Sequence, residues 1–68
     1  MQNQVSDTYI LGIKEGRSLL AHNPDFTLQD MQACAENCKR LARDFSQPMK
    51  DVFKGERDFW LNQIKVKG

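Results

Sequence analysis

The stretch "FTLQDMQACAENCKRLARDF", residues 26 to 45, decides the fold that this sequence predicts. Thr27 and Asp30 form a variant of the capping box, and Phe26 and Met31 stand where a hydrophobic staple would close around that cap. From Leu28 onward, apolar residues recur at spacings of three and four, and polar residues fill the other side. We therefore expect an amphipathic helix over residues 28–44.

Two further helices flank this one. Proline interrupts the chain in "HNPDF", residues 22 to 26, and again in "SQP", residues 46 to 48. The first segment predicts a helix over 7–21, capped by Ser6 or Asp7, and the third predicts a helix over 48–65 with Ser46 or Gln47 as its cap. We expect residues 1–6 to be a flexible N-terminus.

The order of these segments predicts an all-α fold in a single domain, residues 1–68. Only about five residues join the first two helices, so we expect them to form an antiparallel helical hairpin. The third helix then packs across this hairpin as a small helical bundle, or reaches to another chain.

Gly12 and Gly16 weaken the first helix, since each glycine costs roughly 1 kcal/mol against alanine inside a helix. One interpretation is that they let another helix backbone come close, with Ala35 and Ala42 of the middle helix facing them. The other is that they fray or kink an otherwise ordinary helix. The sequence leaves both open.

The third helix carries an unusually broad apolar stripe, because Phe59 and Leu61 fall on either side of the line through Trp60. Such a stripe favours burial against more than one neighbour, and in a domain this small the extra neighbour can be a second subunit. We therefore expect a homodimer. The alternative is that Phe59 or Leu61 is partly exposed, as single apolar residues often are.

Composition excludes several classes of protein. Ten Lys and Arg against nine Asp and Glu leave a net charge of +1, so no strong field attracts nucleic acid or an acidic membrane. The longest uncharged apolar run, "YILGI", is far short of the ~20 residues that cross a bilayer, and the polar start lacks the features of a signal peptide. We expect a cytoplasmic protein that does not enter membranes.

The two cysteines, Cys34 and Cys38, lie on the apolar stripe of the middle helix. With His22 they offer three ligands where structural zinc takes four, so we expect them to pack in the core, with no metal and no cofactor. A single histidine without a nucleophile, an acid pair or a phosphate loop beside it predicts no enzyme activity.

The middle helix offers an alternative function through a short basic group, Lys39, Arg40 and Arg43. A small DNA-binding regulator could use these side chains on the phosphate backbone. Acidic neighbours dilute their charge, however, and the turn before the helix is longer than that of a helix-turn-helix motif. We therefore rank DNA binding second.

Two stretches, "YILGIKEGR" at 9–17 and "FKGERDFWLNQIK" at 53–65, resemble the small early-region accessory proteins of lambdoid bacteriophages and prophages, in particular those encoded between the exonuclease and excisionase genes. The resemblance implies a helical protein made early in infection in the bacterial cytoplasm. It implies action by binding to a host or phage protein, or within the lysis–lysogeny switch. It assigns no role to any residue.

Together these observations predict a regulatory module that acts by protein–protein interaction. Aromatic residues and arginine dominate interface energetics. We therefore expect the partner or dimer interface to include Tyr9, Phe53, Arg57, Phe59 and Trp60.

Overall fold

The computed structural model describes residues 6–68, which form three helices: α1 (Asp7–His22), α2 (Leu28–Asp44) and α3 (Met49–Lys67). The described range contains no strand, which confirms the all-α class. The expected ranges 7–21, 28–44 and 48–65 differ from these bounds by at most two residues at any end. The expected flexible N-terminus lies outside the described residues, except for Ser6.

The helix starts show why the chain folds locally in this way. At α2 the capping box is complete: the Thr27 hydroxyl accepts from the Asp30 N–H at 3.1 Å, and the Asp30 carboxylate accepts from the Thr27 N–H at 3.0 Å. At α1 the Ser6 hydroxyl accepts from the Tyr9 N–H at 3.1 Å. At α3 the expectation of a Ser46 or Gln47 cap is wrong, since Pro48 is the N-cap and makes no side-chain cap bond.

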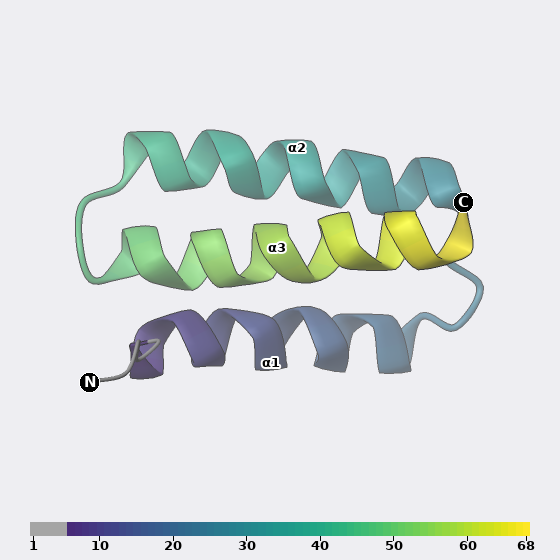
Figure 1. The fold of residues 1–68 in the computed structure, drawn as a ribbon, viewed down its shortest axis with the longest axis horizontal. Helices are drawn as coiled ribbons and strands as arrows, with labels where there is room; N and C mark the ends of the chain where they lie inside the picture. The colour runs from purple at the N-terminus through teal and green to yellow at the C-terminus, as the bar shows by residue number, and fades with distance from the viewer. Residues whose placement is uncertain (1–5) are drawn as a thin grey trace.

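The three helices lie side by side with α3 in the middle (Figure 1). Both outer helices pack along α3, and the backbones of α1 and α2 do not come close to each other. At the end of α1, the Leu20 side chain reaches the core that α2 and α3 share. The expected pairing of the first two helices is therefore not what the structure shows. The segment between them passes the C-terminal end of α3, so that α2 and α3 form the antiparallel hairpin while α1 runs parallel to α3 (Figure 1).

Glycines explain why α1 packs on α3. A Cβ at Gly12 would lie 1.9 Å from the Val52 carbonyl oxygen, and a Cβ at Gly55 would lie 2.0 Å from the Tyr9 carbonyl oxygen. The two backbones thus approach where no other residue fits. Close approach was one of the two interpretations of the α1 glycines. Their neighbours are backbone atoms of α3 and, at Gly16, the Phe59 ring, and not the alanines of α2.

The core lies mainly between α2 and α3. Its buried members are Met31, Ala35 and Cys38 from α2 and Trp60 from α3. Trp60 is fully buried, and Phe26 from the α1–α2 connection packs on its ring at a centroid distance of 5.6 Å. Since α3 is covered by α1 on one side and α2 on the other, one chain covers most of its broad apolar stripe. Leu61 stays 45% exposed, which is the alternative that the sequence allowed, so the stripe does not require a second subunit.

Candidate functional site

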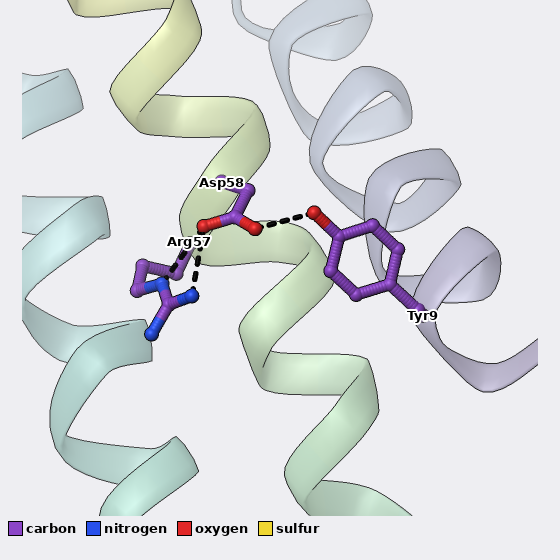
Figure 2. A network of polar contacts seen from close by, with 3 residues as sticks. All are labelled: Tyr9, Arg57 and Asp58. Atoms are coloured by element: carbon purple, nitrogen blue, oxygen red, sulfur yellow. Dashed lines mark hydrogen bonds and ion pairs between the residues drawn. The ribbon is translucent and has the colours of Figure 1, made fainter. Parts of the chain in front are cut away.

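A polar network joins α1 to α3 (Figure 2). The Tyr9 hydroxyl donates a short hydrogen bond to Asp58 Oδ2. The other carboxylate oxygen, Oδ1, accepts from Arg57 Nε at 2.9 Å and pairs with Arg57 Nη2 at the same distance. Both Asp58 oxygens therefore have partners, and the charge of this carboxylate is balanced by its neighbour in sequence.

The network changes the acidity of Tyr9. Its hydrogen bond to Asp58, followed by desolvation and the negative charge of that carboxylate, raises the pKa of the Tyr9 phenol above 10.0, while the Arg57 charge opposes the shift. Deprotonation would remove the donated hydrogen bond and set a phenolate against a carboxylate. Tyr9 is therefore held as a neutral donor that ties α1 to α3.

Beside this network, α1 and α3 enclose an open cleft of ≈ 340 Å³. The α1 residues that line it share one face of the helix at spacings of four: Tyr9, Ile13 and Arg17. The α3 residues that line it are two pairs one turn apart: Asp58, Phe59, Asn62 and Gln63. The cleft thus has apolar side chains from both helices and a rim of charged and amide groups.

Two other hollows are larger but present fewer polar groups together. One, of ≈ 440 Å³, lies around Leu20, Phe26 and the end of α3, where Val66 is 74% exposed. The other, of ≈ 410 Å³, lies between α2 and α3 around Leu61 and Glu36. Neither combines a cation, a carboxylate and two amides as the α1–α3 cleft does, so this cleft is the best candidate site.

The structure brings together some of the residues that the sequence pointed to. Tyr9 and Phe59 line the cleft, and Arg57 adjoins it through Asp58. The expectation that Trp60 lies at the interface needs correction. This side chain has no exposed surface, so it belongs to the core of the single chain and cannot be an exposed anchor. Phe53 lies elsewhere, in an edge-to-face pair with Phe45 at 5.2 Å.

The basic group of α2 lies on the exposed outer side of that helix. Lys39 is 3.7 Å from Glu36, Arg43 is 3.9 Å from Asp44, and Arg40 donates to the Asn37 side chain at 2.6 Å. Each cation thus has an acidic or amide neighbour on its own helix. These exposed contacts are weak, but the Glu36 and Asp44 charges reduce the positive field that a DNA-binding surface needs.

The cysteines lie where core packing predicts. Cys38 is buried and Cys34 is half-buried, and both thiols are free. Burial, with the charge and hydrogen bond of Glu56, raises the pKa of Cys38 to about 12, and burial also raises the pKa of Cys34. His22 binds the Ser18 carbonyl oxygen through Nδ1 at 2.8 Å.

Within residues 6–68, no cluster of three or more His, Cys, Asp or Glu side chains is arranged to hold a metal ion. In the same range, no helix combines the length and apolar character that a bilayer span requires.

Sequence reasoning missed Arg17, Asp58, Asn62 and Gln63 as members of this site. Their spacing could have indicated a shared helix face, because Asp58 and Asn62 are four residues apart, as are Ile13 and Arg17. What the pattern does not give is that the two helices are neighbours.

By fold, this is an all-α protein with a central helix flanked by two others. Comparisons of the chain with protein-family models, with curated proteins and with solved structures find no match.

Proposed function

We propose that this protein is a small accessory module that acts by binding another protein and catalyses no reaction. The observation that carries the proposal is the α1–α3 cleft, where Ile13 and Phe59 supply apolar surface inside a polar rim. Specific protein interfaces share this arrangement of an apolar centre and a hydrogen-bonding rim. Tyr9 on the rim and Arg57 beside it are of the residue types enriched in such interfaces.

The partner that we propose is a host or phage protein met in the bacterial cytoplasm. The resemblance of residues 9–17 and 53–65 to lambdoid early-region proteins supports this choice. These two stretches also contain every residue that lines the cleft. The same resemblance supports a regulatory role in early infection or in the lysis–lysogeny switch.

Dimerisation stays a separate prediction. If a second copy of the chain binds, it would cover some of the seven large apolar side chains that are at least 38% exposed in the described chain: Ile10, Leu11, Leu19, Phe45, Met49, Leu61 and Val66. Sedimentation velocity at micromolar concentration measures it directly. A single species near 7.9 kDa would exclude the dimer and leave the cleft proposal unaffected.

Two charge reversals test the proposed function, Arg17→Glu in the cleft and Arg40→Glu on α2. Each change lowers the net charge from +1 to +1 − 2 = −1, so the two variants carry the same charge. Both residues are exposed helix positions, so we expect both changes to have similarly small effects on stability. Each variant and the wild type are immobilised and incubated with bacterial lysate. We expect one protein to be retained by wild type and Arg40→Glu and to be lost with Arg17→Glu.

The opposite pattern would support the alternative, a DNA-binding regulator. In that case Arg40→Glu loses nucleic acid, Arg17→Glu keeps it, and binding of the wild type weakens steeply with salt. Equal retention of one protein by all three would show that the cleft is not the binding surface.

A further inference from the structure

The α1–α3 cleft has one end whose charge is already balanced. Asp58 is satisfied on both oxygens by Tyr9 and Arg57. The Asp58 carboxylate therefore needs no positively charged group from a ligand. The Arg57 guanidinium also reduces the repulsion between Asp58 and an incoming anion.

The other end has donors without partners. Arg17 forms no ion pair within residues 6–68, and its side chain is exposed at the mouth of the cleft. In the same range, no side-chain hydrogen bond within the chain involves Asn62 or Gln63. A guanidinium and two amides thus line one recess, and all three carry N–H donors.

We propose that this end of the cleft recognises a carboxylate that stands next to an apolar side chain in a peptide segment of the partner. The planar guanidinium of Arg17 can hold a carboxylate through two parallel hydrogen bonds. Asn62 and Gln63 donate to the remaining lone pairs, and Ile13 and Phe59 take the apolar side chain. The inference rests on the proposed function and names the chemistry of the segment that binds.

Such a carboxylate has two sources, the C-terminus of a chain or an Asp or Glu side chain. Three probes separate them: N-acetyl-leucine, which carries a terminal carboxylate, N-acetyl-Glu-Leu-amide, which carries a side-chain carboxylate, and neutral N-acetyl-leucinamide. Each is titrated into ¹⁵N-labelled full-length protein. The side-chain NH₂ resonances of Asn62 and Gln63 report on the site directly.

We expect saturable shifts of both NH₂ groups with at least one of the acids, with a dissociation constant in the millimolar range, and no saturation with the neutral amide. The acid that binds more tightly identifies the source. Arg17→Gln should weaken binding about tenfold, since it removes hydrogen bonds to a charged group. Arg40→Gln, which removes an exposed guanidinium from α2, should leave binding unchanged.

Three results would overturn the proposal: equal binding by the Arg17→Gln and Arg40→Gln variants, equal binding of the neutral amide, or no shift of Asn62 and Gln63 with either acid. Both substituted residues are exposed, so a wild-type ¹⁵N spectrum outside the cleft verifies the fold of each variant. If lysate capture depends on Arg17 while neither acid binds, the cleft remains the interaction surface and only the carboxylate chemistry is wrong.

Discussion

Replacing Gly12 by alanine separates what helix propensity predicts from what the packing of α1 on α3 predicts. In an isolated helix the change stabilises by about 1 kcal/mol. In this fold the new Cβ would stand 1.9 Å from the Val52 carbonyl oxygen and 2.8 Å from the Glu56 nitrogen. Both obstacles are backbone atoms, which no side-chain rotation moves away.

The size of the effect follows from these distances. Ordinary contact begins at 3.4 Å, so the two helices must separate by 3.4 − 1.9 = 1.5 Å at this point. Overpacking of a well-packed contact costs roughly 1–3 kcal/mol. Taking the upper end because the obstacle is rigid, and subtracting the gain of about 1 kcal/mol in propensity, we expect a net loss of about 2 kcal/mol. For a domain of this size that lowers Tm by about 8–16 °C.

Thermal and urea unfolding followed by far-UV circular dichroism measure the change. Ser18→Ala, an exposed site on the same helix, is the control and should gain a few tenths of a kcal/mol. Gly55→Ala should match Gly12→Ala, while Gly16→Ala should cost less, since its obstacle is the Phe59 ring. A Gly12→Ala protein as stable as Ser18→Ala would refute the close packing of α1 on α3.

Three further predictions concern single side chains. Thr27→Ala removes the α2 cap and should cost about 1 kcal/mol of unfolding free energy; an unchanged urea midpoint would contradict the capping box. Tyr9 is the only tyrosine, so absorbance at 295 nm isolates its ionisation. Its midpoint should lie above 10.0 in the folded protein and fall toward that value in Asp58→Asn. Because the pKa of Tyr9 is raised in the folded protein, the stability linked to this phenol is fully present below pH 10.0 and is lost as pH rises through the folded pKa. A titration midpoint of 10.0 in the native protein would exclude the network. Cys38 should resist iodoacetamide at pH 8, because its pKa of about 12 leaves almost no thiolate, while Cys34 reacts faster; mass spectrometry showing equal alkylation of native and urea-unfolded Cys38 would contradict its burial.

Local signals in the sequence accounted for α2 most completely. Its bounds, its capping box and its buried face follow from Thr27, Asp30 and the spacing of apolar residues, because all of these act within a few residues of chain. The same reasoning placed Cys38 in the core. The start of α3 was less well predicted, since Pro48 takes the cap position without a side-chain bond.

The order of the helices could not be read in the same way. Periodicity shows which face of a helix is buried but not which helix covers it. The short connection suggested that α1 pairs with α2, whereas Gly12 and Gly55 together make α3 the closer neighbour. The cleft depends on this arrangement, because Tyr9 and Asp58 are 49 residues apart in sequence. The prediction that Trp60 lies at an interface failed for the same reason. The packing of the helices buries this large aromatic side chain in the core of the single chain.

The candidate site exists only if α1 packs on α3, and proton–proton distances from nuclear Overhauser spectra test that most directly. The structure predicts contacts between the Gly12 Hα protons and backbone protons of Val52 and Glu56, and no contacts between backbone protons of α1 and backbone protons of α2. Contacts from Gly16 to the methyl protons of Ala35 or Ala42, with none from Gly12 to α3, would instead establish an α1–α2 hairpin and would remove the cleft.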